Sequence, residues 1–245
     1  MKNCLLPFLA SAIVSAGSTA HANERRFAFT YETTTSPAGS IEGEQTTFWE
    51  SGRGFDTFTF KQELEFGITD RFQLSFYLFN FEHAREDGVS SNQWAGSGIE
   101  GIYQLSDPNK SFLGSALYFE TILNDRDLEL EGKILLQKNF GPLILAYNGV
   151  IEAHWEDGYQ NRVGVLEQTL GLSYQVQPSF SVGLEAKQEV AYENWQDSQG
   201  NAVFVGPNLC YRKGQFFFAA TCLFRVSNVV GEPDIELGTV LGFHF

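Results

Sequence analysis

The last twelve residues, Asp234-Ile-Glu-Leu-Gly-Thr-Val-Leu-Gly-Phe-His-Phe245, alternate in side-chain character along their length. Every second position belongs to a set that is apolar apart from one threonine: Ile235, Leu237, Thr239, Leu241, Phe243 and Phe245. The positions between them are mostly small or polar. Alternation with a period of two is typical of a β-strand with two unlike faces. Eleven such residues are enough to cross a bilayer as a tilted strand. The chain is therefore predicted to end in a membrane-spanning strand.

The carboxy-terminal residue points to a compartment. A strand that finishes on Phe245 is similar to the closing strand of bacterial outer-membrane β-barrels, in which this ending is read by the assembly machinery. The resemblance makes Phe243 and Phe245 the expected assembly signal and the barrel assembly machinery an expected partner. It turns a general all-β prediction into the prediction of a protein of the bacterial outer membrane.

The amino end favours the same route. Lys2 precedes an apolar run over residues 5–16, and Ala20-His21-Ala22 follows as an A-x-A cleavage site. This pattern predicts a signal peptide over residues 1–22, because the apolar run is too short to span a membrane. In the remaining sequence we find no run of eighteen apolar residues, so no membrane-spanning helix is predicted.

Composition excludes several classes of function. The formal net charge is −14, which argues against nucleic acid as a partner because binding phosphates needs a basic surface. Cys210 and Cys222 are expected on opposite faces of the sheet, so no disulfide between them is predicted. No ligand spacing for a metal is evident, and we expect no cofactor.

From residue 40 onward the chain divides into alternating segments typical of barrel strands. The segments are 40–50, 55–68, 72–83, 92–105, 112–121, 128–140, 143–153, 166–176, 180–192, 202–213, 215–225 and 233–245. Tight turns are predicted at 69–71, 107–109, 141–142, 177–179 and 213–214. Longer loops are predicted at 84–91, 122–127, 154–165, 193–201 and 226–232. The fold class is therefore all-β: a single antiparallel transmembrane β-barrel of about twelve strands, with short periplasmic turns and longer extracellular loops.

Residue parity across the turns supports a membrane barrel over a soluble β-sandwich. A turn at 141–142 places Phe140 opposite Leu143, and Leu136 opposite Tyr147, so apolar residues gather on one face. That face is expected to contact outer-membrane lipid and lipopolysaccharide. Residues 40–245 form the predicted barrel, and residues 23–39 are expected to form an amino-terminal arm in the periplasm or in the lumen.

The opposite face of the strands carries charged residues, which are therefore expected to line the lumen. They comprise fourteen acids and five bases. The candidates are Glu42, Glu44, Lys61, Glu63, Glu65, Glu100, Glu120, Glu129, Glu131, Lys133, Glu152, Glu167, Glu185, Lys187, Glu189, Arg212, Arg225, Asp234 and Glu236.

Two interpretations of this interior remain open. A narrow barrel can fill its interior with paired glutamates, lysines and arginines, which would give a closed structural or binding barrel. An excess of carboxylates instead favours a hydrated, acid-lined lumen, because burying unpaired charge without water is costly. The predicted function is accordingly a passive channel for small solutes, with the closed barrel as the alternative.

Catalysis is not expected. His83 and His154 lie near the predicted outer ends of strands, and Ser90, Glu156 and Asp157 are close in sequence. No pairing of a nucleophile with a base is visible, so an enzyme that modifies lipid at the rim remains only a third hypothesis.

One stretch carries a family resemblance. Residues 58–78 read FTFKQELEFGITDRFQLSFYL, after TYETTTSPAGSIEGEQ at 30–45. The order of a Pro-x-Gly turn, a glutamate-rich strand and the run from Glu65 to Leu74 resembles outer-membrane barrel proteins associated with the meta-pathway of phenol degradation, and related uncharacterised barrels. The resemblance covers the first third of the chain. It implies an outer-membrane location and a role in solute passage, and it supplies no catalytic residues.

Overall fold

The computed structural model describes residues 25–245 as an all-β protein. The expected signal peptide, residues 1–22, lies outside the described residues. In chain order the strands are β1 (Ile41–Gly52), β2 (Phe55–Thr69), β3 (Phe72–Glu86), β4 (Val89–Ser106), β5 (Gly114–Leu123), β6 (Leu128–Phe140), β7 (Leu143–Glu156), β8 (Asn161–Gln177), β9 (Phe180–Glu193), β10 (Asp197–Ser198), β11 (Ala202–Lys213), β12 (Phe216–Arg225) and β13 (Ile235–His244).

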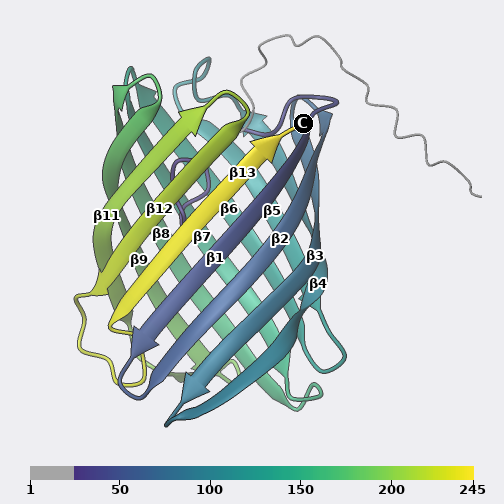
Figure 1. Ribbon diagram of the computed structural model, residues 1–245, viewed down its shortest axis with the longest axis vertical. Helices are drawn as coiled ribbons and strands as arrows, with labels where there is room; N and C mark the ends of the chain where they lie inside the picture. The colour runs from purple at the N-terminus through teal and green to yellow at the C-terminus, as the bar shows by residue number, and fades with distance from the viewer. Residues whose placement is uncertain (1–24) are drawn as a thin grey trace, which may run out of the picture.

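Twelve of these strands close into one antiparallel barrel, and the two-residue β10 is an extra pairing on β9. Each barrel strand pairs with its neighbours in the chain, and β13 returns to pair with β1. The strands run obliquely around the wall (Figure 1), as the closure of a sheet into a barrel requires. The described residues contain no helix long and apolar enough to cross a membrane. The predicted all-β, twelve-stranded fold is confirmed.

The outer face of the wall is apolar. Phe79, Ile134, Ile151 and Leu184 are all more than half exposed. The inner face instead buries charged and amide side chains, including Glu120, which is 1% exposed. A soluble domain has the reverse arrangement, whereas a barrel surrounded by lipid needs an apolar exterior. The distribution of side chains therefore identifies the wall as a membrane-spanning one.

The connections differ at the two ends of the barrel. At the end that carries Phe245, four turns have two residues each and a fifth, at 107–113, has seven. At the opposite end the connections lengthen along the chain, from two residues at 53–54 to nine at 226–234. We call these ends the short-turn end and the long-loop end. In Figure 1 the short-turn end is uppermost.

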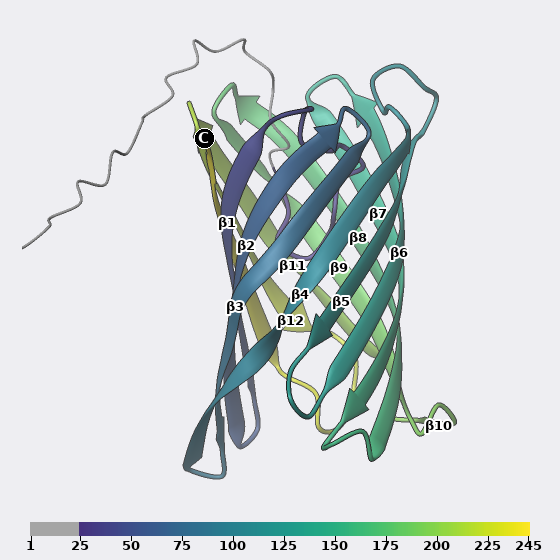
Figure 2. The ribbon, with the colours of Figure 1, turned by 90° about the vertical axis from the view of Figure 1, so that its right-hand side faces the viewer.

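One predicted loop is instead a hairpin. The prediction of a loop at 84–91 is wrong, because β3 and β4 continue to pair as far as Glu86 and Val89. Asp87 and Gly88 form the turn, with φ of 47° and 84°. Two residues with positive φ are favoured in a tight hairpin turn, and Asp-Gly is among the best sequences for it. The hairpin extends beyond the rest of the barrel as a ribbon (Figure 2).

The hairpin of β11 and β12 differs from the prediction in register, since a turn at 213–214 would place Cys210 opposite Phe217. The turn between β11 and β12 lies at 214–215, so Cys210 pairs with Ala219 and not with Phe217. A shift of two residues keeps every side chain on its predicted face. Cys210 accordingly lies buried inside the barrel, whereas Cys222 is half-buried in the wall, and both are free thiols.

Candidate functional site

The interior of the barrel holds most of the charged residues that alternation assigns to it. Those most deeply buried are Glu42, Glu44, Glu63, Glu65, Glu100, Glu120, Glu131, Glu185, Lys187 and Glu236. Others are half-buried in the same inner wall: Lys61, Glu129, Lys133, Glu152, Glu167 and Glu189. Successive strands present these residues inward because every second side chain of a strand points to the same face.

Three of the predicted lumen residues, Arg212, Arg225 and Asp234, lie at the ends of the barrel, and the prediction that Asp234 lines the lumen is wrong because it is exposed in the loop before β13. Arg212 donates from Nε to the Pro178 carbonyl oxygen at 3.2 Å, at the short-turn end. Arg225 pairs with Asp234 and donates to the Val229 carbonyl, at the long-loop end. Each long side chain is held at a rim by a loop carbonyl, so neither reaches the middle of the interior.

The interior is occupied by the chain itself. Residues 25–36, which we call the lumen segment, enter the barrel from the short-turn end and form a loop inside it (Figure 1). The lumen segment contains no strand or helix, and seven of its twelve residues are buried. Without a β-ladder, its backbone N–H and C=O groups must find other partners. The inward side chains of the wall supply them.

A single carboxylate holds the turn of the lumen segment. Glu185 on β9 accepts the Ala28 N–H through Oε1 at 3.0 Å, and the Phe29 and Thr30 N–H groups through Oε2 at 3.1 and 2.8 Å. The Thr221 hydroxyl on β12 also donates to Oε1. Bonds to a charged acceptor are stronger than neutral ones. Glu185 is therefore an anchor that binds three consecutive peptide groups to the wall.

Amide side chains hold the part of the segment that follows. Asn148 on β7 accepts the Tyr31 N–H at 2.7 Å and donates to the Tyr31 carbonyl at 2.9 Å. Gln137 on β6 accepts the Thr33 N–H at 2.8 Å, and Gln104 on β4 donates to the Thr33 carbonyl at 2.9 Å. An amide carries both a donor and an acceptor, as a peptide group does. The wall therefore replaces the ladder that this segment lacks.

Two more amides act near the ends of the segment. Gln73 on β3 accepts the Ser36 N–H at 2.9 Å. Asn208 on β11 donates to the Arg26 carbonyl at 2.8 Å. Contacts from strands on all sides of the barrel thus meet on one short loop, which fixes its position within the short-turn half.

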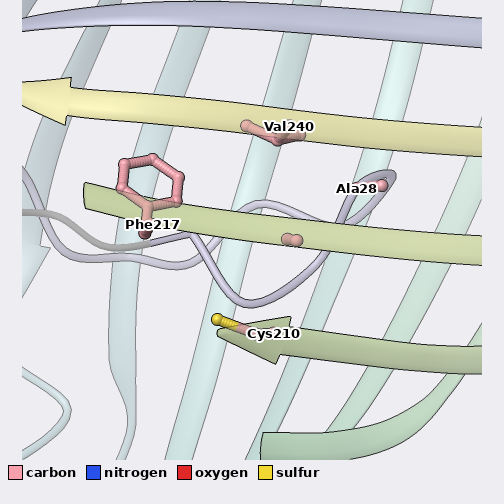
Figure 3. Packing of buried hydrophobic residues seen from close by; sticks show 5 residues of the cluster. Ala28, Cys210, Phe217 and Val240 are labelled. Atoms are coloured by element: carbon pink, nitrogen blue, oxygen red, sulfur yellow. The ribbon is translucent and has the colours of Figure 1, made fainter. Parts of the chain in front are cut away.

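Apolar packing complements these hydrogen bonds. Phe27 is fully buried against Ile144 and Ala146, and a Cβ added at Gly171 would lie 2.7 Å from its ring. Ala28 packs against Cys210, Phe217, Ala219 and Val240 of three successive strands (Figure 3). Gly171 therefore provides the space that the Phe27 ring fills. The lumen segment is packed as a core is packed.

Basic and aromatic side chains of the lumen segment and of the wall meet in one layer, on the side of the segment that faces the middle of the barrel. Arg25 forms an ion pair with Glu44 at 2.7 Å and stacks over the Tyr31 ring at 4.1 Å. Lys133 lies 4.5 Å from the Tyr31 ring centre and 4.4 Å from that of Tyr118. Cations over aromatic faces are stabilised by the ring quadrupole. A cavity of about 190 Å³ remains here, so the interior above the segment is narrow and strongly charged.

The predicted assembly residues close the wall at the short-turn end. The Phe245 N–H donates to the Ile41 carbonyl at 2.9 Å, which joins the end of the chain to the start of β1. The rings of Phe243 and Phe245 meet edge to face at 5.4 Å. Both face outward and are exposed, so they are accessible from outside the barrel.

The two histidines of the enzyme hypothesis lie in different settings. His83 Nδ1 is hydrogen-bonded to Asn92 Oδ1 at 2.7 Å on the exposed β3–β4 ribbon. His154 Nε2 is hydrogen-bonded to Glu152 Oε2 at 2.8 Å inside the long-loop end. Within the part of the chain that the structure describes, neither forms a hydrogen bond with a serine hydroxyl, so a serine–histidine pair is not assembled there.

The amides that hold the lumen segment carry no charge, so the alternation of charged residues did not predict them. Gln73, Gln104, Gln137 and Asn148 each occupy an inward position in the short-turn half of a strand. A set of inward amides at similar depth is the signal that could have revealed them. Such a set predicts a peptide backbone inside the barrel, because amides match its donors and acceptors.

Comparisons with solved structures place this fold among outer-membrane barrels. A COG4313 outer membrane channel from Pseudomonas putida F1 is 13% identical with a TM-score of 0.61, covering 87% of this chain and 98% of that one. The NanC porin is 10% identical with a TM-score of 0.55, covering 83% and 98%. The translocator domain of the autotransporter NalP from Neisseria meningitidis is 12% identical with a TM-score of 0.51, covering 84% and 88%. At these identities the likeness shows the fold alone.

Sequence comparison supplies the family. No curated protein matches the chain. A family model described as a family of unknown function, DUF6662, matches residues 19–233, which is most of the sequence. The chain therefore belongs to the DUF6662 family, and it has the fold of a bacterial outer-membrane β-barrel.

Proposed function

We propose that this protein is a passive channel for small solutes in the bacterial outer membrane, and that its lumen segment closes the conduit at rest. The observation that carries the proposal is the way the segment is held. Its peptide groups are bound by side chains of the wall, including those of Glu185 and Asn148, and residues 25–36 are not a strand of the sheet. A segment that is not a strand of the wall can leave without breaking the barrel.

The orientation follows from the assembly route. The closing strand ends at the short-turn end, which we assign to the periplasm, as in bacterial barrels with short periplasmic turns. The lumen segment then closes the periplasmic half of the conduit, and solutes enter from the long-loop end. Outer-membrane lipid and lipopolysaccharide contact the apolar exterior, and the barrel assembly machinery is the expected partner during insertion.

The charge of the interior gives the expected selectivity. Acids outnumber bases among the inward side chains, and a conduit with excess negative charge attracts cations and repels anions. The resemblance over residues 58–78 to barrels associated with phenol degradation makes small phenols the first neutral solutes to test. Phe29 and Tyr118 line the cavity beside the lumen segment, and their aromatic rings offer phenols an apolar contact.

The test is a planar-bilayer recording on two forms of the refolded protein. One begins at Asn23, the expected mature start, and the other lacks residues 23–36. Residues 37–40 are kept because Gly39 and Ser40 hydrogen-bond to Gly67 at the rim. We expect small, rare steps from the longer form, and large, steady, cation-selective steps from the shorter one.

A third form is the matched control. It replaces residues 25–36 with a glycine–serine segment of equal length, which keeps the tether and removes the contacts. We expect conductance between the other two. Absence of steps from all three forms would overturn the channel proposal and favour the closed structural or binding barrel.

A further inference from the structure

A row of glutamates crosses the inner wall from one end of the barrel to the other. On successive strands from β1 to β7, six glutamates and one serine lie directly opposite one another: Glu42, Glu65, Ser75, Glu100, Glu120, Glu131 and Glu152. We call the six glutamates the carboxylate row. Because the strands are tilted, a row in register climbs along the barrel axis. It begins at the second residue of β1 and ends four residues before the last of β7.

Each end of the carboxylate row meets a histidine. At the short-turn end, His244 pairs with Glu42 across β13 and β1, with Nδ1 2.9 Å from Glu42 Oε2. At the long-loop end, His154 Nε2 lies 2.8 Å from Glu152 Oε2, and its Nδ1 lies 3.9 Å from Glu129 Oε2. The row therefore runs between two imidazoles through carboxylates alone, apart from Ser75.

The row carries more negative charge than its neighbours neutralise. Beside it lie three further carboxylates, of Glu44, Glu63 and Glu129. Against these nine carboxylates stand Arg25, Lys61 and Lys133, together with the two histidines at the ends of the row. Glutamates directly opposite each other on adjacent strands repel. An excess of buried carboxylates requires protons or cations.

At the short-turn end of the row, buried carboxylate oxygens lack hydrogen-bond donors. Glu42 and Glu44 are only 1% and 4% exposed. Glu42 Oε1 and Glu44 Oε2 accept no hydrogen bond from any residue in the described range 25–245. A carboxylate oxygen from each of Glu42, Glu44 and Glu65 lies within 4.8 Å of the other two. This cluster of three carboxylates therefore includes buried oxygens without a hydrogen-bond donor, on Glu42 and Glu44. Carboxylate oxygens are the hard ligands that a divalent cation takes.

The long-loop end offers a second set of donors. One ligand atom from each of Glu129, Glu152 and His154 lies within 4.8 Å of the others. Glu129 and His154 also line a cavity of about 350 Å³ with Glu82 and Glu156, at the mouth of the barrel. Carboxylates suit manganese, and imidazole suits iron and zinc, so a mixed set favours a divalent transition metal.

We propose that the carboxylate row binds divalent transition-metal cations, with one site at Glu129, Glu152 and His154 and another at Glu42, Glu44 and Glu65. Between these sites, the carboxylate row continues through Glu100 on β4, Glu120 on β5 and Glu131 on β6. This inference rests on the proposed channel in that it names its substrate class. Metal ions enter at the long-loop site, and they move along the row to the short-turn end when the lumen segment leaves the barrel.

The binding test uses Mn²⁺ and the refolded protein beginning at Asn23. The electron paramagnetic resonance signal of free Mn²⁺ reports how many ions each chain takes up. We expect two saturable sites. Glu152→Gln with His154→Ala should weaken one at least about tenfold, and Glu42→Gln with Glu65→Gln should weaken the other similarly. Glu189→Gln, an inward glutamate outside the row whose carboxylate contacts Lys187, is the matched control.

Folding of the variants is checked by thermal unfolding. Replacing a repelled glutamate with glutamine relieves like-charge contact, so Glu42→Gln with Glu65→Gln should unfold at or above the temperature of the unsubstituted protein without metal. Glu152→Gln with His154→Ala also removes the imidazole beside Glu129, so its unfolding temperature should stay near that of the unsubstituted protein. Added Mn²⁺ should raise the unfolding temperature of the unsubstituted protein and of Glu189→Gln more than that of either double variant. No Mn²⁺ uptake by a folded protein, or uptake unaffected by both double variants, would overturn the proposal and assign protons to the row.

The result is separable from the channel test. If the protein conducts after removal of residues 23–36 but does not bind Mn²⁺, the channel proposal is supported and the metal-site proposal is contradicted. If Mn²⁺ binding depends on the carboxylate row but no form of the protein conducts, the metal-site proposal is supported and the channel proposal is contradicted.

Discussion

Glu185 on β9 accepts the backbone N–H of Thr30 at 2.8 Å, which joins the turn of the lumen segment to the wall. The same carboxylate takes the N–H groups of Ala28 and Phe29. Glu185→Gln keeps the shape but turns one acceptor oxygen into an NH₂ group that faces an N–H donor. We expect the closed arrangement to lose about 2–3 kcal/mol, since bonds to charged acceptors contribute about this much. Single-channel recording should show open events more than about tenfold more frequent.

The matched control is Glu189→Gln, four residues along the same strand. Its carboxylate contacts Lys187 at 3.2 Å and makes no bond to the lumen segment. Its open frequency should stay within about twofold of the unsubstituted protein. Equal behaviour of the two variants would show that Glu185 does not hold the segment.

Gly171 tests the packing of the segment without touching a hydrogen bond. Gly171→Ala would place a Cβ 2.7 Å from the Phe27 ring. The ring must move, and overpacking of this kind costs about 1–3 kcal/mol. Gly132→Ala is the control, because its Cβ meets only Ile151 at 3.8 Å. Proteolysis of the folded protein in detergent should cut within residues 25–36 faster in the first variant alone.

The Asn148 side chain makes two hydrogen bonds to the Tyr31 backbone, which we call the amide clamp, and one substitution can remove one of them alone. Asn148→Asp keeps an acceptor for the Tyr31 N–H and removes the donor to the Tyr31 carbonyl. We expect a loss of about 1–2 kcal/mol, in the range for one buried hydrogen bond whose partner is left bare. Hydrogen exchange of the Tyr31 amide should accelerate by about tenfold, while amides of β7 outside the clamp exchange as before. Unchanged exchange at Tyr31 would contradict this role for Asn148.

The bounds of the strands could be predicted closely because side chains of a membrane-spanning wall alternate between the lipid and the interior. β6 at Leu128–Phe140 and β11 at Ala202–Lys213 have the predicted bounds. Alternation weakens outside the lipid, where both faces meet water. That is why Asp87-Gly88 was assigned to a loop although the dipeptide favours a hairpin turn.

The site was predictable only in part, for a related reason. Inward glutamates such as Glu120 and Glu131 follow from parity alone. The lumen segment does not, because its partners are scattered over strands far apart in the chain. The Thr33 backbone alone forms hydrogen bonds with both Gln104 and Gln137. Periodicity in the sequence does not reveal that these three residues meet. Register across strands, which only the structure supplies, also reveals that Glu120 and Glu131 face each other.

Phe245 allows the assembly signal to be separated from barrel stability. The residue is 73% exposed, and its backbone N–H bond to Ile41 survives Phe245→Ala. Loss of its edge-to-face contact with Phe243 should cost the refolded barrel no more than about 1.5 kcal/mol. If the side chain is read during assembly, the amount recovered from outer-membrane fractions should fall severalfold. Phe112→Ala removes an exposed ring from a turn at the same end and should leave recovery unchanged. Equal recovery of both variants would rule out a targeting role for the terminal ring.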